Sequence, residues 1–342
     1  MRFVVELALE IKHLFQSFGG DKVEKNVLYD ICLKVVKGQT IALVGPSGCG
    51  KSTLLNIISG ILKPKEGKII LHKDENNAEP ELITRPSRNV LMIPQQYPLY
   101  PHMTAIENVA IGLKWDETDL WQRPPLVQRF DLCTDKRTGR VISWKKLREI
   151  HLEEAAALLC KLGLAESLHK YPKQLSGGMQ QRVAIARVLI MKPKILLMDE
   201  PFGALDMATR KDAQDLILKI SEENAQAKKE GRTPPVTIIF VTHELEEAIL
   251  VGDRVVCLSQ YWSSAAEADC RAKGASTIIY DRIAPVFPST HDVDFETFRE
   301  QRDEVFDFAF NKSFLPKKEE FRLTFWDELK EGKGRGVLSN GK

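Results

Sequence analysis

The stretch GPSGCGKST, from Gly45 to Thr53, constrains the fold of this 342-residue chain more than any other feature. It follows TIALV at 40–44, a short apolar segment that predicts a buried strand, and it leads into STLLNIIS, which favours a helix. Two more apolar segments, ILLMD at 195–199 and VTIIFV at 236–241, also predict buried strands. Because these strands alternate with helical patterns, we expect an α/β fold with a parallel sheet covered on both faces.

The N-terminal part of the chain reads as β structure and the middle as helix. Alternation of apolar and polar residues predicts strands over 5–15 and 27–36, with a GGDK turn at 19–22 near the first of them. Helical periodicity predicts helices over 145–164 and 179–191. The chain therefore begins with strands and places a helical segment between two strands of the expected sheet.

Two regions fit this pattern less well. The segment 114–144 is rich in Trp, Arg, Pro and Asp and is interpreted as a partly irregular insertion. After about residue 260 the strand pattern fades, a helix is predicted over 294–310, and the last residues are expected to be flexible. We therefore expect one domain over 1–260 and a partly helical C-terminal extension over 261–342.

The glycine-rich loop has the composition of a polyphosphate-binding site. Glycines let several backbone N–H groups approach a chain of phosphates, and the following helix adds a positive N-terminus. Lys51 would reach the β- and γ-phosphates, and the Ser52 hydroxyl would bind Mg²⁺. The residues expected to hold the nucleotide here are Gly45, Pro46, Ser47, Gly48, Cys49, Gly50, Lys51, Ser52 and Thr53. Cys49 is interpreted as a small residue that fits the loop rather than as a redox cysteine.

Two adjacent acids end the strand at 195–199. Asp199 would face Mg²⁺ through its bound water, and Glu200 would face an attacking water. Neighbouring side chains on a strand point to opposite faces, so both acids reach one site only if Glu200 lies where the strand ends. Either acid alone could be a strand-terminal cap, but the pair together with the glycine-rich loop favours catalysis.

Composition excludes several other classes of function. A net charge of +2 gives no field that favours nucleic acid or an anionic membrane. The six cysteines show no CxxC pair and no His/Cys spacing typical of zinc, which indicates a reducing compartment without disulfides or metal–thiolate sites. The N-terminus does not resemble a signal peptide, and no apolar run reaches the ~18 residues of a membrane span. Any membrane-spanning part is expected on another chain.

Taken together, five motifs resemble those of the nucleotide-binding subunit of ATP-binding cassette (ABC) transporters. They are GPSGCGKST, LSGGMQQ at 175–181, ILLMDEP, GALD at 203–206 and VTHE at 241–244. The resemblance covers about 5–260 and implies a P-loop ABC cassette. Such a cassette has a RecA-like core, an N-terminal antiparallel β-subdomain and an α-helical signature subdomain, here about 97–192. It further implies ATP and Mg²⁺ as cofactors and ATP hydrolysis as the reaction.

The resemblance also assigns further site residues. Phe18 matches the aromatic that stacks on adenine, with Phe15 as a near alternative. Gln95 matches the glutamine whose amide oxygen reaches Mg²⁺, although Gln96 beside it leaves the register open. His243 matches the histidine that holds the γ-phosphate and orients water, so with Lys51 and Glu200 it completes the expected catalytic set.

The signature motif implies an assembly. In the resembled family two cassettes pair head to tail, so Ser176, Gly177 and Gly178 would contact the γ-phosphate held by the partner copy, and Asp206 would also contribute in trans. A second copy of the chain is therefore one expected partner.

The segment YPLYPHMTAIENV and the signature region resemble those of bacterial importers that are fed by a solute-binding protein, which indicates the kind of transporter. The C-terminal part is similar to that of the nitrate, sulfonate and taurine group. This implies a peripheral subunit on the cytoplasmic face of the inner membrane, bound to permease subunits and served indirectly by an extracytoplasmic binding protein. Two alternatives remain: a soluble cassette ATPase acting on nucleic acid or ribosomes, and the ATPase of an efflux or lipid-handling system.

Overall fold

The computed structural model describes residues 5–20, 23–72, 79–96, 99–117, 132–134, 141–203, 205–263, 270–285, 287 and 295–333. The chain divides into two compact units. The first unit comprises 1–95, 194–203 and 214–342, and the second comprises 96–193 and 204–213.

A six-stranded sheet forms the centre of the first unit. Its strands, in spatial order, are β12 (Thr277–Ile283), β11 (Arg254–Ser259), β3 (Thr40–Val44), β10 (Thr237–Val241), β9 (Ile195–Asp199) and β6 (Val90–Ile93). All neighbours are parallel except β11 and β12, which are antiparallel. Every residue of β3, β10 and β11 is buried, as expected for strands covered on both faces. The predicted α/β fold with a parallel sheet is confirmed.

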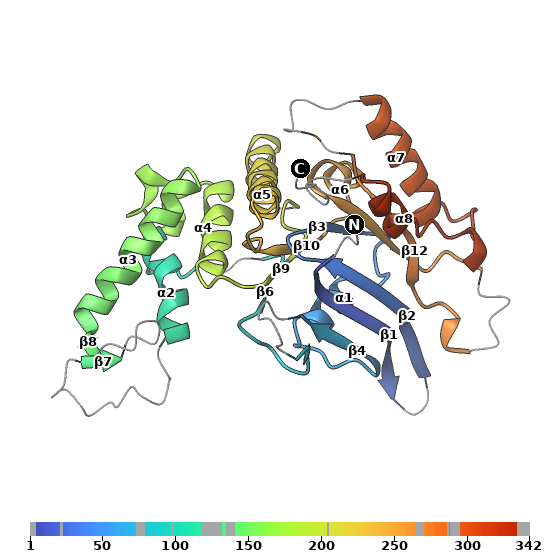
Figure 1. Ribbon diagram of the computed structural model, residues 1–342, viewed down its shortest axis with the longest axis horizontal. Coiled ribbons are helices and arrows are strands. Elements are labelled where there is room, and N and C mark those ends of the chain that lie inside the picture. Colours follow the sequence, from blue (N-terminus) through green and yellow to red (C-terminus); the bar gives the residue numbers. More distant parts are fainter. Residues whose placement is uncertain are drawn as a thin grey trace. The chain divides into compact units, whose positions relative to one another are not determined.

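A second, antiparallel sheet is built from the N-terminal part of the chain (Figure 1). Its order is β2 (Val23–Val36), β1 (Leu7–Gly20), β4 (Glu66–Leu71) and β5 (Glu81–Leu82). Strands β1 and β2 are longer than the apolar alternation predicts, since polar residues such as Ser17 and Asn26 still pair across the hairpin. Backbone pairing does not require buried side chains, so Gly19 and Gly20 of the turn predicted over 19–22 belong to the ladder, where Gly19 pairs with Glu24. Residues 21–22 of that turn lie outside the described residues.

One hydrophobic core joins the two sheets through helix α1 (Lys51–Ile58). The buried face of α1 contributes Leu54, Leu55, Ile57 and Ile58 to a cluster that also contains apolar residues of β1, β2, β3, β9 and β10. Because this helix follows the glycine-rich loop directly, its packing fixes the position of the loop.

The C-terminal part of the first unit adds helices and one strand. These are α6 (Leu245–Val251), α7 (Phe295–Ala309) and α8 (Phe325–Lys330), and α5 (Met207–Lys229) begins in the second unit and continues in the first. The helix predicted over 294–310 corresponds to α7. Strand β12 lies beyond residue 260, where the sequence pattern fades, yet it pairs with β11 at the edge of the central sheet. Its apolar run ends at Tyr280, before the charged Asp281 and Arg282, and is too short to have been identified as a strand from the sequence.

The second unit is helical. It contains α2 (Ala105–Glu117), α3 (Trp144–Lys161), α4 (Gly177–Leu189) and a short hairpin of β7 (Leu132–Thr134) and β8 (Val141–Ser143). Short 3-10 helices occur in both units, at Ala165–Ser167, Pro172–Gln174, Cys270–Ala272 and Lys318–Glu320. Most of the insertion predicted over 114–144 lies outside the described residues. Among the residues described, no helix combines the length and apolar character needed to cross a bilayer.

Candidate functional site

The glycine-rich loop connects the buried strand β3 to the first turn of α1. At Gly45 (φ +152°) a β-carbon would lie 2.0 Å from the carbonyl oxygen of Leu258, so only glycine fits against β11. Gly48 (φ +78°) has no atom within 4 Å of the position that a β-carbon would take, so the loop leaves open space there. The loop therefore packs tightly against β11 at Gly45 and borders open space at Gly48.

Lys51 is buried, and its ammonium group turns back onto the loop. Its Nζ donates to the carbonyl oxygens of Gly45 (2.7 Å) and Pro46 (3.0 Å). Carbonyl oxygens carry only partial charge, so the positive charge of Lys51 remains available to an anion. The side chain of Cys49 lies 3.8 Å from Nζ and is itself buried, and this burial raises the pKa of its thiol. A neutral, buried thiol supports the interpretation of Cys49 as a small packing residue.

Asp199, at the carboxyl end of β9, accepts a hydrogen bond from the Ser52 hydroxyl at 3.2 Å. Burial raises the pKa of the Asp199 carboxyl, and the negative charge of the nearby Glu200 also raises it. The hydrogen bond from Ser52 and the positive charge of Lys51 each act to lower this pKa. A hydroxyl and a carboxylate oxygen at this separation are the hard donors that Mg²⁺ prefers.

Glu200 lies one residue beyond β9 in the left-handed conformation, with φ +46°. This conformation is costly for a residue with a β-carbon, by about 1–2 kcal/mol, and it breaks the alternation of side chains along the strand. Its backbone N–H is fixed by the carbonyl oxygen of Val241 at 3.0 Å. The sequence required Glu200 to lie where the strand ends, and the structure places it there.

The Glu200 carboxylate is held by two side chains that sequence motifs had singled out. The Gln95 amide donates to one oxygen at 2.8 Å, and His243 Nδ1 lies 3.5 Å from the other. Gln95, not Gln96, therefore occupies the position facing Glu200. His243 also contacts Glu244, the last residue of the VTHE motif, at 3.2 Å through Nε2.

The signature motif opens α4 in the second unit. Ser176 is the N-cap of this helix, because its side chain accepts a hydrogen bond from the Met179 N–H at 3.3 Å. Ser176 and Gly177 are exposed, whereas Gly178 is buried. A β-carbon at Gly178 would lie 2.1 Å from Thr209 Cγ2, so this glycine makes room for the first turn of α5. Thr209 is a neighbour that no sequence signal identified.

Asp206 also has a structural role in the chain itself. Its carboxylate accepts hydrogen bonds from the backbone N–H and the hydroxyl of Thr209, which caps the N-terminus of α5. The GALD and LSGG segments therefore meet at Thr209 within the second unit.

A family model described as ABC transporter matches residues 28–203, which is more than half of the chain. The chain belongs to the ABC transporter family. The chain is 38% identical over 255 residues to the nitrate import ATP-binding protein NrtC of Synechocystis sp., which covers 73% of this chain and 31% of that protein. It is 36% identical over 254 residues to the sulfate/thiosulfate import ATP-binding protein CysA of Pseudomonas aeruginosa, covering 74% and 64% respectively. The chain thus spans about one third to two thirds of these relatives.

A solved structure of the same fold is the ATP-binding cassette MJ0796, a dimer in a post-hydrolysis state bound to ADP and Pi. It superposes with a TM-score of 0.55 at 26% identity and covers 82% of this chain and 100% of its own. The predicted membership of the family and the predicted cassette fold are both confirmed.

The candidate adenine contact of this ABC family member lies on β1. Phe18 is 43% exposed, so its ring is free to accept a stacking partner. The alternative, Phe15, is half-buried and packs edge-on against Tyr29 at 5.3 Å, with the Arg271 guanidinium 4.5 Å from its ring centre. The structure therefore favours Phe18 over Phe15 for this contact, and the assignment itself stays a prediction.

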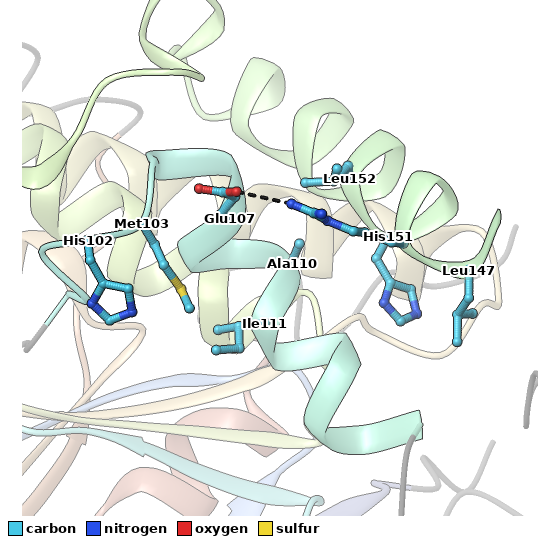
Figure 2. A pocket seen from close by; sticks show the side chains of 9 residues that line it. His102, Met103, Glu107, Ala110, Ile111, Leu147, His151 and Leu152 are labelled. Atoms are coloured by element: carbon cyan, nitrogen blue, oxygen red, sulfur yellow. Dashed lines mark hydrogen bonds and ion pairs between the residues drawn. The ribbon is translucent and has the colours of Figure 1, made fainter. Parts of the chain in front are cut away.

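The helical unit of the cassette contains a pocket of about 520 Å³ between α2 and α3 (Figure 2). Its lining is mostly apolar, with Met103, Ala110, Ile111, Leu147 and Leu152, and it carries His102 and His151. Arg148 and Glu107 form an ion pair of 3.3 Å at this pocket. No sequence motif indicated this pocket, because its lining comes from helices far apart in the chain.

Proposed function

We propose that this chain binds ATP with Mg²⁺ and hydrolyses it as the energy-coupling subunit of an importer whose membrane-spanning permease is a separate chain. The observation that carries the proposal is the Glu200 carboxylate, which a strained backbone holds between Gln95 and His243 beside the glycine-rich loop. Strained residues that the surroundings hold in place are typical of functional sites. The sequence identity with the import ATP-binding relatives supports the same function.

The residues present fit a magnesium nucleotide. The loop N–H groups and the buried Lys51 charge suit a polyphosphate, and the open space at Gly48 leaves room for it. Ser52 and Asp199 would hold Mg²⁺, which neutralises phosphate charge when bound, and Gln95 adds an amide oxygen to this set. Phe18 would stack on the base.

Hydrolysis is assigned to Glu200, His243 and Lys51. Glu200 accepts a proton from the attacking water, and the hydrogen bond from Gln95 keeps its carboxylate in place. His243, 48% exposed and beside Glu200, orients the water and contacts the terminal phosphate. Lys51 stabilises negative charge on the phosphate oxygens.

A matched pair of variants tests the binding role of Lys51. Lys51→Met removes the charge while keeping an apolar stem of similar length, and we expect the Kd for ATP to rise by about 10- to 100-fold, because a charge-assisted hydrogen bond contributes about 1.5–3 kcal/mol. Nucleotide binding is measured by equilibrium fluorescence titration. The control is Lys330→Met on α8, where the lysine is exposed, and unchanged affinity in Lys51→Met would contradict the assignment.

We propose further that two copies pair head to tail, with Ser176 and Gly177 of one copy facing the nucleotide of the other. Both residues are exposed at the N-terminus of α4, so they are free to meet a partner. The buried Gly178 and the capping Asp206 support this surface from within, through Thr209. ATP hydrolysis would then require the dimer.

Substitutions at the two neighbouring glycines of the signature motif test dimer assembly and folding separately. A β-carbon at Gly177 meets only Leu205 Cδ2 at 3.6 Å, so we expect Gly177→Ala to fold normally but to slow hydrolysis by roughly tenfold through steric cost at the dimer contact. Gly178→Ala should instead destabilise the chain by about 1–3 kcal/mol, because it overlaps Thr209. Thermal unfolding and ATPase rates are measured for both. Thr209→Ser, which removes the overlapping methyl group, should restore the stability of Gly178→Ala.

The pocket between α2 and α3 is the surface that we propose for the permease. It is apolar with a charged rim, as expected for a groove that accepts an amphipathic segment of a partner. It begins at His102, only a few residues along the chain from Gln95. The subunit would act at the cytoplasmic face of the inner membrane, with an extracytoplasmic binding protein as an indirect partner.

For the transported solute we propose a small inorganic anion or a sulfonate such as taurine. The relatives are named for import of nitrate and of sulfate/thiosulfate and, at 37% identity, for transport of bicarbonate in Synechococcus elongatus. Reconstitution with the permease in vesicles and uptake measurements with nitrate, sulfate, bicarbonate and taurine would test this. Uptake of none of them, or ATP hydrolysis stimulated by RNA or DNA in place of the permease, would overturn it in favour of the alternatives.

A further inference from the structure

Outside the proposed nucleotide site, the β1–β2 hairpin brings together three side chains of the types that bind transition metals. His13 lies on β1, and Asp30 and Cys32 lie on β2. One ligand atom from each residue lies within 4.8 Å of the others. Their separation in sequence hides this set, since the His/Cys spacing of the chain showed no metal-binding pattern.

The three ligand atoms form a triangle close to one face of a tetrahedral zinc site. With bonds of about 2.3 Å to sulfur and 2.0–2.2 Å to nitrogen and oxygen, the ligand atoms of such a site are about 3.4–3.6 Å apart. Here Cys32 Sγ lies 3.7 Å from His13 Nδ1 and 4.0 Å from Asp30 Oδ1, and His13 Nδ1 lies 2.8 Å from Asp30 Oδ1. Small side-chain rotations that lengthen the last contact would complete the geometry.

Two of the three residues have an energetically unfavourable backbone conformation. His13 (φ +46°) and Asp30 (φ +49°) are both in the left-handed conformation, which among the described residues only Lys192 and Glu200 share outside glycine. The β1–β2 register shifts on either side of Leu14, and such bulges turn side chains away from their regular alternation. Two adjacent strained positions thus direct both side chains to the same point.

The backbone also orients the sulfur. The N–H of His13 donates to Cys32 Sγ at 3.3 Å and so fixes the position of the sulfur, although burial raises the pKa of this thiol. All three residues line a cavity of about 810 Å³, together with Glu10, so a bound ion would have room for a further ligand.

We propose that His13 Nδ1, the Asp30 carboxylate and Cys32 Sγ bind one divalent transition metal ion, with Zn²⁺ the best fit and water in the remaining position. Nitrogen, oxygen and sulfur donors in one tetrahedral set suit zinc and its spectroscopic substitute Co²⁺, and they disfavour Mg²⁺. On binding, the Cys32 thiol loses its proton to solvent.

Titration of the purified full chain with Co²⁺, without nucleotide or Mg²⁺, tests the proposal. We expect one equivalent to bind, with the charge-transfer absorption of a cobalt–thiolate bond and the visible bands of a tetrahedral ion, and Zn²⁺ to remove both. Cys32→Ser should abolish the charge-transfer band, and His13→Asn or Asp30→Asn should weaken binding at least about tenfold. Asparagine tolerates the left-handed conformation, so these variants should fold as the parent does.

The control is Cys160→Ser, an exposed cysteine in the helical unit, which should keep the full signal. A second readout is the thermal midpoint, which Zn²⁺ should raise in the parent and in Cys160→Ser but not in His13→Asn. The proposal is overturned if the parent shows no charge-transfer band, if Cys32→Ser retains it, or if Zn²⁺ stabilises His13→Asn as much as the parent. In those cases the cluster is only a surface hydrogen-bonded pair beside a thiol.

Discussion

Glu200→Gln is expected to lower the rate of ATP hydrolysis by about 100-fold or more while leaving ATP binding intact. Proton transfer to a positioned carboxylate contributes about 10²–10⁴-fold to such reactions, and an amide cannot accept the proton. The substituted side chain keeps its size, and its amide oxygen can still accept the hydrogen bond from Gln95. Single-turnover phosphate release and nucleotide titration measure the two effects separately.

The same substitution at Glu246 is the matched control. Glu246 is exposed in the first turn of α6, three residues beyond His243, and has no proposed role. We expect Glu246→Gln to hydrolyse ATP at the parent rate. Because Glu200→Gln binds ATP without consuming it, a stable dimer should accumulate on a sizing column. Hydrolysis at the parent rate in Glu200→Gln would disprove the assignment of Glu200 as the base.

The core of the fold could be predicted because its signals are local. Strand β3 and the loop after it are contiguous, and the buried apolar residues of β9 and β10 read as short apolar runs. The position of Glu200 also followed from sequence, since two adjacent acids can share one site only at a strand end. In each case the physical constraint acts between residues that are neighbours in the chain.

Features that depend on distant residues could not be predicted in this way. Thr209 fills the space left by Gly178, and His13 meets Cys32 only through the register of a bulged hairpin. Strand β12 joins the sheet because it pairs with β11, although its own pattern is weak. The motifs indicated the candidate residues of the proposed nucleotide site, including Gln95 and His243 beside Glu200, but they did not indicate Thr209, which lies against Gly178 and Asp206.

Among these contacts between residues distant in the chain, those of Arg254 are expected to contribute most to stability. It is fully buried in β11 and forms two hydrogen bonds with the Asp281 carboxylate on β12, at 2.5 and 2.6 Å. A third nitrogen donates to the carbonyl oxygen of Lys34 on β2 at 2.7 Å, and the guanidinium lies 3.6 Å from the ring centre of Phe325 on α8. One side chain thus connects both sheets with the C-terminal helix.

We expect Arg254→Met to lower the free energy of unfolding by about 3–5 kcal/mol, because it leaves the Asp281 carboxylate buried without its counter-charge. Denaturant titration measures this loss of stability.

A double variant tests whether the unpaired charge is the cause. The double variant Arg254→Met/Asp281→Leu removes both charges, and we expect it to recover most of the stability, since an apolar pair of similar volume often replaces a buried ion pair without loss. An exposed pair provides the contrast: Lys330→Met, which breaks the contact with Asp327, should change stability by about 0.5 kcal/mol or less. If Arg254→Met were as stable as the parent, the ion pair would contribute nothing to stability. If instead the double variant were no more stable than the single one, the uncompensated charge of Asp281 would not be the cause of the loss. The guanidinium would then act mainly through its packing on Phe325, and Phe325→Leu should reproduce the loss.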